Sequence, residues 1–389
     1  MFKRVTLFRF FNFPVKADAS WIFLSILIFW TLVNNFFPAR YPGHNLETYQ
    51  VMGAVTLVGV IISIIAHEVA HAIIAEYYHM PIESITLFIF GGVAEMKGEP
   101  SHPKGEFLMA LAGPAMSALL GIFFWASENV YMMQYGAADA GSQVLEYLGD
   151  LNMLIAAFNM VPAFPLDGGR ALRAAIWHYK NNLVLATRIA SGLGANFAYL
   201  LLGYAVYKIC WHNNMVQGMW YGLFGYFVYG AGLYAVRQTE SRSLLSSEKV
   251  TRFMHDRIVS VSPDLTITDL VDGYFYKHYQ KLFPVVDRDK LVGVVTLQAV
   301  LLLDRNKWSF LHVASVMQPL TEENTIDPDT SAADALELMQ KQGRDSLLVT
   351  RDGKFMGVIA LRDLFAYLSI TMKVDRDRPV LTSRGADGR

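Results

Sequence analysis

The sequence predicts a multi-pass α-helical membrane protein of about six transmembrane helices with a membrane-embedded β-strand or hairpin, followed by a cytoplasmic α/β pair of modules. Of its 389 residues, 53% are hydrophobic and 17% are charged, which is more apolar than an ordinary soluble protein. The apolar residues concentrate between residues 20 and 236, and the composition becomes polar after about Arg237. The net charge of −1 argues against a nucleic-acid partner.

Six apolar segments approach the ~20 residues that a helix needs to cross a bilayer. They lie near residues 20–37, 51–77, 106–126, 144–162, 187–210 and 215–236. Basic residues gather before the first segment, between the second and third, between the fourth and fifth, and after the sixth. Because Lys and Arg favour the cytoplasmic side, we predict a plasma (inner) membrane protein with both termini in the cytoplasm.

The second segment carries His67-Glu68-Val69-Ala70-His71 near its cytoplasmic end. Helical spacing puts the two imidazoles on one face, where both can bind one Zn²⁺. Glu68 then lies near the metal, where it can take a proton from a water molecule. Ionisable side chains in an apolar segment are costly, which favours a functional site. The alternative is a chance match on a helix whose His and Glu only contact solvent.

A third protein ligand is expected, because catalytic zinc sites usually have three protein ligands and a water. The stretch from Asn159 to Arg170 offers Asp167. Pro162 and Pro165 should end the fourth helix, and the two glycines after Asp167 permit backbone shapes that are closed to other residues. Asp167 would then lie at the same cytoplasmic side as the histidines. The alternative is an ordinary Asp-Gly turn.

These motifs, together with Gly91-Gly92, resemble the site-2 protease family of intramembrane zinc metalloproteases (peptidase family M50) over residues 1 to about 237. The resemblance implies a metalloendopeptidase with one zinc ion per chain and with Glu68 as the general base. The implied zinc ligands are His67, His71 and Asp167. It further implies a transmembrane protein substrate, for example an anti-sigma factor, that is cut near the cytoplasmic face.

Four residues are candidates for binding the substrate. Asn159 offers an amide donor to the substrate backbone or to the developing oxyanion, and Asn152 lies on roughly the same helix face. The alternative for both is hydrogen bonding between helices. The β-branched and aromatic stretch 85–90, followed by Gly91 and Gly92, predicts a strand with an open edge that pairs with an extended substrate. The alternative there is a structural hairpin.

The third apolar segment departs from the family pattern. Its Ala112-Gly113-Pro114 turn is followed by Ser117, where the family often has an asparagine. We therefore expect only close helix packing through small residues at this point.

An internal repeat follows the apolar region. The stretch LVGVV at 291–295 recurs as FMGVI at 355–359, which is 64 residues later, and such a period indicates two copies of one unit. The repeat resembles a tandem pair of cystathionine-β-synthase (CBS) modules. The expected organisation is a protease domain over residues 1–238, a linker over 239–248, CBS modules over 249–306 and 307–372, and a polar, disordered tail over 373–389.

CBS pairs often bind adenine nucleotides and self-associate, so the resemblance implies a nucleotide and a homodimer. The family's nucleotide signature has a Thr followed three residues later by Asp. The first repeat has Thr296 but Ala299, and the second has Ala360 but Asp363. Thr296 and Asp363 are thus the candidate nucleotide-binding residues. The alternative is a purely structural pair of modules in which Asp363 starts a helix.

Two other functions stay open. A CBS-regulated transporter or channel would fit the tail, but the membrane region lacks the repeated halves that many transporters have. A non-catalytic binder of membrane helices would fit the apolar segments, but it would not need the complete set of two His, one Glu and one Asp.

Overall fold

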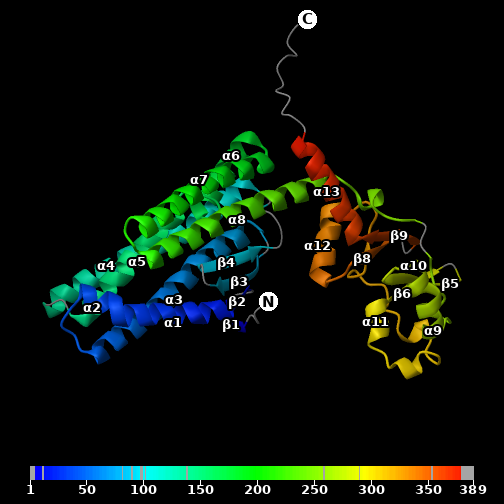
Figure 1. The fold of residues 1–389 in the computed structure, drawn as a ribbon, viewed down its shortest axis with the longest axis horizontal. Helices are drawn as coiled ribbons and strands as arrows, with labels where there is room; N and C mark the ends of the chain where they lie inside the picture. Colours follow the sequence, from blue (N-terminus) through cyan, green and yellow to red (C-terminus); the bar gives the residue numbers. More distant parts are fainter. Residues whose placement is uncertain are drawn as a thin grey trace, which may run out of the picture. The chain divides into compact units, whose positions relative to one another are not determined.

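The computed structural model describes residues 5–10, 13–80, 82–88, 91–96, 100, 102–136, 139–256, 259–288, 290–351 and 354–377. Contacts divide the chain into two compact units, Met1–Thr239 and Glu240–Arg389. In Figure 1 the first unit runs from blue to green and the second from yellow-green to red.

The first unit consists mainly of helices that coincide with the apolar segments. They are α1 (Ala19–Thr31), the π-helical turn η1 (Leu32–Phe36), α2 (Phe37–Arg40), α3 (Leu46–Tyr77), α4 (Pro103–Tyr135), α5 (Ala140–Asn159), α6 (Asp167–Lys180), α7 (Leu183–Cys210) and α8 (Met215–Ser246), which extends into the second unit. Each of the six predicted segments lies largely on a helix.

The membrane location is supported by the length and composition of these helices. Within the described residues, four are long and apolar enough to cross a bilayer: Ala19–Arg40, Leu46–Tyr77, Pro103–Tyr135 and Leu183–Cys210. Their outer faces carry large apolar side chains, such as Leu119 and Leu200, which are 63% and 73% exposed, and a continuous apolar exterior suits lipid rather than water. The count of six spans stays a prediction.

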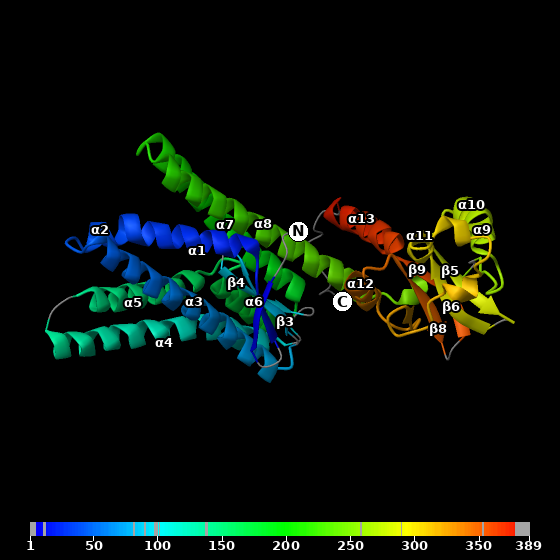
Figure 2. The same cartoon turned by 90° about the horizontal axis from the view of Figure 1, so that it is seen from below.

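Local capping signals set the bounds of the long helices. The side chain of Asn45 accepts a hydrogen bond of 2.8 Å from the backbone N–H of Thr48 at the start of α3, and Asp139 with Ser142 forms a capping box at the start of α5. Gly136 ends α4 in the left-handed conformation, with φ of 72°, which glycine adopts without a steric penalty. α4 packs along α5 and α3 (Figure 2).

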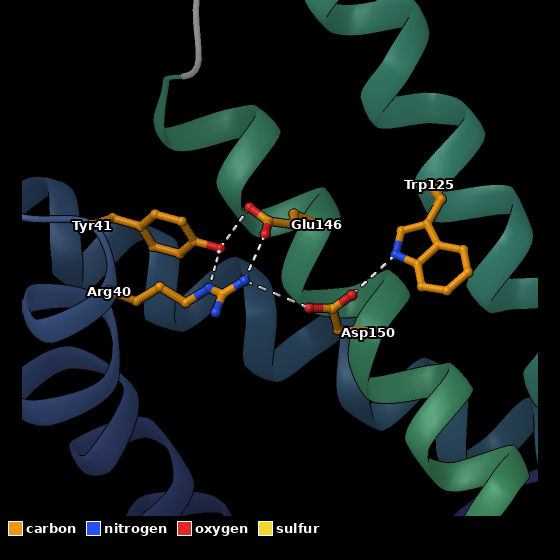
Figure 3. A network of polar contacts seen from close by, with 5 residues as sticks. All are labelled: Arg40, Tyr41, Trp125, Glu146 and Asp150. Atoms are coloured by element: carbon orange, nitrogen blue, oxygen red, sulfur yellow. Dashed lines mark hydrogen bonds and ion pairs between the residues drawn. The ribbon is translucent and has the colours of Figure 1, made fainter.

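A polar network, here called the arginine network, joins α2, α4 and α5 (Figure 3). Nη2 of Arg40 lies 2.8 Å from Oε1 of Glu146 and 3.9 Å from Oδ2 of Asp150. The hydroxyl of Tyr41 donates to Glu146 at 2.7 Å, and Nε1 of Trp125 donates to Asp150 at 3.2 Å. These contacts fix the end of α2 against α5.

A four-stranded sheet of order β1-β2-β3-β4 completes the first unit. Its strands are β1 (Val5–Phe10), β2 (Phe13–Ala17), β3 (Ile82–Phe88) and β4 (Gly91–Met96). β3 pairs in parallel with β2 and antiparallel with β4, so the expectation of an open edge on this strand is wrong. One side of β3 is covered by β2, from an N-terminal region for which no strand is predicted, and the other side is covered by β4. Next to β3, the strand with an open edge in the described sheet is therefore β4. Residues 89 and 90 of the expected strand lie outside the described residues.

The second unit shows the repeat in its strands. The first copy has β5 (Leu282–Asp287) and β6 (Lys290–Thr296), and the second has β8 (Ser346–Arg351) and β9 (Lys354–Ala360). Each hairpin has a register shift at the equivalent place, between Val285 and Val286 and between Val349 and Thr350. The copies also exchange segments, since His255 pairs with Val358 and Gln318 with Val294.

Helices surround these strands, and each copy has its own apolar core. The remaining elements are η2 (Val250–Arg252), α9 (Ile267–Leu270), η3 (Val271–Phe275), α10 (Tyr276–His278), α11 (Leu297–Leu301), η4 (Arg305–Lys307), η5 (Val313–Ser315), β7 (Thr325–Ile326), α12 (Ala332–Gln342) and α13 (Leu361–Asp377). A smaller cluster that includes Leu291, Val294 and Leu348 joins the two copies.

Two segments differ from the expected organisation. Residues 239–246 of the expected linker are helical, because α8 continues to Ser246, and Leu245 is buried in the core of the second unit. Residues 373–377 of the expected disordered tail belong to α13. Pro and Gly favour helix ends, and the stretch from Leu361 to Asp377 contains neither. Residues 378–389 lie outside the described residues.

Candidate metal centre

Helix α3 presents the two histidines on one face, as the spacing predicts. His67 and His71 are one turn apart and are 5% and 4% exposed. Glu68 lies between them in the chain and is 7% exposed. Three ionisable side chains are therefore removed from solvent within about one turn of a helix whose preceding residues, 55–66, are apolar or small.

Asp167 is delivered by the irregular connection between α5 and α6. α5 ends at Asn159, and Asp167 is the first residue of α6. The two glycines that follow are required by close backbone approach. A Cβ at Gly168 would overlap the carbonyl of Met160, and one at Gly169 would overlap the backbone nitrogen of Phe164. The connection thus folds tightly against the first turn of α6, and Asp167 is 8% exposed.

The three candidate ligand atoms form a nearly equilateral triangle. Nε2 of His67 lies 3.2 Å from Oδ2 of Asp167 and 3.2 Å from Nε2 of His71, and Nε2 of His71 lies 3.3 Å from the same oxygen. A tetrahedral zinc with bonds of about 2.0–2.1 Å needs ligand atoms about 3.3–3.4 Å apart. Two imidazole nitrogens and one carboxylate oxygen are also a usual donor set for catalytic zinc.

The Nδ1 atoms of both rings, here called the outer nitrogens, already have hydrogen-bond partners. The Nε2 atoms, here called the inner nitrogens, are left to bind a metal. Nδ1 of His71 lies 2.6 Å from the carbonyl oxygen of Met109, which can only accept, so Nδ1 carries the hydrogen. Nδ1 of His67 lies 2.9 Å from Oγ of Ser117. With neutral rings, two nitrogen lone pairs and a carboxylate oxygen converge, and a bound cation would offset their repulsion.

Helix α4 packs directly against the two histidines. A Cβ on Gly113 would overlap Nε2 of both histidines, so only glycine lets α4 approach this closely. Ser117 follows Gly113 by four residues and therefore lies on the same helix face. The sequence predicts only close packing for this segment, and it does not reveal the contact of Ser117 with His67. The i, i+4 spacing of Gly113 and Ser117 was the available signal.

The two asparagine candidates lie on α5. Asn152 is fully buried, and its Nδ2 donates to Oγ of Ser63 at 3.0 Å and to the carbonyl of Leu148 at 2.8 Å. Ser63 precedes His67 by one helical turn of α3. Asn159 is half-buried at the last residue of α5, eight residues before Asp167. Gly91 and Gly92 begin β4.

The two nucleotide candidates lie in the second unit. Thr296 caps α11, because its hydroxyl accepts from the backbone N–H of Ala299 at 3.2 Å. Oδ2 of Asp363 lies 3.0 Å from Nε2 of His255. His255 and Arg362 help to line a cavity of about 680 Å³, while Thr296 lines a second cavity of about 380 Å³. Thr296 and the residues that contact or neighbour Asp363 therefore line different cavities.

Comparison with known proteins gives matches to both units. The family described as Peptidase family M50 matches residues 55–134 and 127–203, and the CBS domain matches residues 250–305 and 313–370.

Three relatives align over nearly their whole length. "Putative zinc metalloprotease Rip3" of Mycobacterium tuberculosis is 27% identical over 385 residues, which are 98% of this chain and 97% of that protein. "Putative zinc metalloprotease sll0528" of Synechocystis sp. is 27% identical over 358 residues, or 90% and 91% of the two chains. "Zinc metalloprotease MJ0392" of Methanocaldococcus jannaschii is 27% identical over 368 residues, or 94% and 96%.

Proposed function

The chain belongs to peptidase family M50 and carries a tandem CBS pair, and from this premise we propose that His67, His71 and Asp167 hold its zinc ion while Glu68 is the general base. The protein is a zinc metalloendopeptidase of the site-2 protease type, which acts within the membrane. The observation that supports the ligand assignment is the triangle of the three inner atoms, with sides of 3.2, 3.2 and 3.3 Å.

The protein's own residues divide the chemistry between them. When bound, zinc polarises the scissile carbonyl and lowers the pKa of the attacking water. Glu68 accepts the proton from this water and delivers it to the leaving amine. Asn159 donates its amide N–H to the substrate backbone or to the developing oxyanion. Asn152 is fully buried and its Nδ2 donates to Ser63 of α3, so it is suited to holding α5 against α3.

We further propose that the substrate pairs with β4. Gly91 and Gly92 begin this strand, and in the described sheet one side of β4 has no neighbour. An extended segment added there would make main-chain hydrogen bonds, which also keep a transmembrane helix unwound for cleavage. The sheet would lie within the membrane, and six helices would cross it with both termini in the cytoplasm. Membrane-anchored regulators, such as an anti-sigma factor, are the proposed substrates.

For the CBS pair we propose an adenine nucleotide and a homodimer. The cavity of about 680 Å³ beside the His255–Asp363 contact is large enough for a mononucleotide. His255, Lys281 and Arg362 supply cationic or hydrogen-bonding groups for phosphates, and Asp363 would bind the ribose. Nucleotide occupancy would then regulate the protease.

Cleavage by a Glu68→Gln variant tests the proposal. Full-length protein is reconstituted in liposomes with single-pass membrane proteins that have been trimmed to short extracytoplasmic stubs. We expect cleavage to fall by roughly 10²–10⁴-fold, with zinc still near one per chain. Glu76→Gln, an exposed carboxylate on the same helix, is the matched control and should cleave normally. A substrate that Glu68→Gln still cuts at the normal rate would show that Glu68 is not the base.

A further inference from the structure

A buried ion pair joins α4 to α6 close to the metal centre. Nε and Nη2 of Arg173 both donate to Oε1 of Glu106. The side chains are 8% and 0% exposed. The second oxygen of the carboxylate, Oε2 of Glu106, is buried without a hydrogen-bond partner. Neither residue belongs to a sequence motif described above.

Each partner lies on an element that presents a group to the metal centre. Glu106 precedes Met109 by one helical turn of α4, and the carbonyl of Met109 holds Nδ1 of His71. Arg173 follows Asp167 by six residues on α6. Its guanidinium also lies 5.2 Å from the ring centroid of Phe164, within the connection that leads to Asp167. The pair therefore joins the support of one ligand to the element that carries another.

Stability alone does not explain such a pair. Removing two charges from water is costly, and apolar residues of similar volume often stabilise a fold equally well or better. The unpartnered Oε2 of Glu106 adds a further cost, because a buried acceptor has lost its bond to water. Two N–H groups of one rigid guanidinium that donate to the same carboxylate oxygen, however, restrict the distance and angle between the helices in a way that apolar packing does not.

We propose that Glu106 and Arg173 are positioning residues that set Oδ2 of Asp167 at the correct distance from the two imidazole nitrogens. The proposal rests on the ligand assignment given above. Arg173 acts through α6 and Phe164 on Asp167, and Glu106 acts through Met109 on His71. Loss of the pair should weaken metal binding and distort ligand geometry, even where the fold survives.

The test compares metal binding by full-length variants in detergent. Zinc affinity is measured by competition with a chelator, and Co²⁺ absorption reports the ligand geometry. Arg173→Met should weaken zinc binding about 10- to 100-fold, the usual effect of losing a group that orients a ligand, and should change the Co²⁺ spectrum. Arg173→Lys keeps the charge but lacks the forked guanidinium, so its zinc affinity should fall between those of the wild type and Arg173→Met.

A double variant separates positioning from stability. Glu106→Leu with Arg173→Met replaces the pair by apolar side chains and should recover thermal stability, while zinc affinity stays weakened. Recovery of both stability and wild-type affinity would overturn the proposal. Glu146→Gln removes a carboxylate that also pairs with an arginine, in the arginine network, and should bind zinc normally.

His67→Ala distinguishes this proposal from the ligand assignment. If His67→Ala loses zinc but Arg173→Met binds it normally, the positioning role is wrong and the ligand assignment stands. If His67→Ala keeps its zinc, the ligand assignment fails and the positioning role fails with it.

Discussion

Two arginine–carboxylate contacts tie helices of the first unit together, and they differ chiefly in burial. In the arginine network (Figure 3), Arg40 and Glu146 are 50% and 31% exposed. In the pair beside the metal centre, Arg173 and Glu106 are 8% and 0% exposed. The contacts lie toward opposite ends of α4, because Trp125 of the network follows Glu106 by 19 residues, or about 28 Å along a helix.

The difference shows how burial changes the role of the same residue types. An exposed pair gains little energy and is screened by salt. Burial and the hydrogen bond to Glu146 raise the pKa of Tyr41 to about 12, so at neutral pH its hydroxyl stays protonated and supports the network as a donor. A buried pair, in contrast, leaves an uncompensated charge when one partner is removed. The exposed contact therefore supports packing, and the buried one is suited to holding a geometry.

Among changes to the packing of α4, the largest expected effect comes from Gly113→Ala, which tests how closely α4 approaches the two histidines. The new Cβ would overlap Nε2 of His67 and His71, and displacement of reacting groups by about 1 Å can cost 100-fold in rate. We expect loss of stoichiometric zinc, and cleavage reduced by about 100-fold or more. Metal analysis and a cleavage assay on the full chain measure both.

Gly203→Ala is the matched control for this substitution. A Cβ at Gly203 would meet nothing within 4 Å, and alanine is the better helix former, so zinc and cleavage should be unchanged. Normal zinc in Gly113→Ala would mean that α4 lies farther from the histidines than the structure shows.

A smaller effect is expected from Ser117→Ala, which removes one hydrogen bond at the same end. His67 would lose the partner of its Nδ1 and with it part of its fixed orientation, so zinc affinity should fall about 10-fold. Ser191→Ala is the control, because Oγ of Ser191 is buried without a partner and its loss should leave the affinity unchanged. Equal affinities in the two variants would exclude a role for Ser117 in orienting the ring.

Much of the fold was predictable because its signals are local. Apolar segments of helical length gave the positions of the long helices, and the 64-residue repeat gave the two copies in the second unit. The sheet was predicted only in part. Its pairing joins residues 15–17 to residues 85–87, and nothing in either short stretch specifies a partner so distant in sequence.

In the candidate site, too, the residues with local sequence signals were predictable and those that depend on distant contacts were not. His67, Glu68 and His71 follow from helical spacing, and Asp167 from a connection rich in Pro and Gly. Ser117, Glu106 and Arg173 were missed because their roles depend on which helix faces meet. In sequence, Glu106 and Arg173 resemble Glu146 and Arg40, and only burial in the folded chain distinguishes the two pairs.

The smallest effect is expected from Glu146→Gln, which weakens the exposed contact. The glutamine oxygen can still accept from Tyr41, but the charge attraction to Arg40 is lost. We expect the thermal transition to fall by a few degrees at most, with zinc content unchanged. The deficit should shrink toward 1 M salt, where the screening length is about 3 Å. Glu128→Gln is a control of opposite sign, because partial burial and then the carboxylates of Glu146 and Asp150 disfavour the charged form of Glu128. A salt-independent loss of stability, or any loss of zinc, would mean that the two contacts do not differ as their burial indicates.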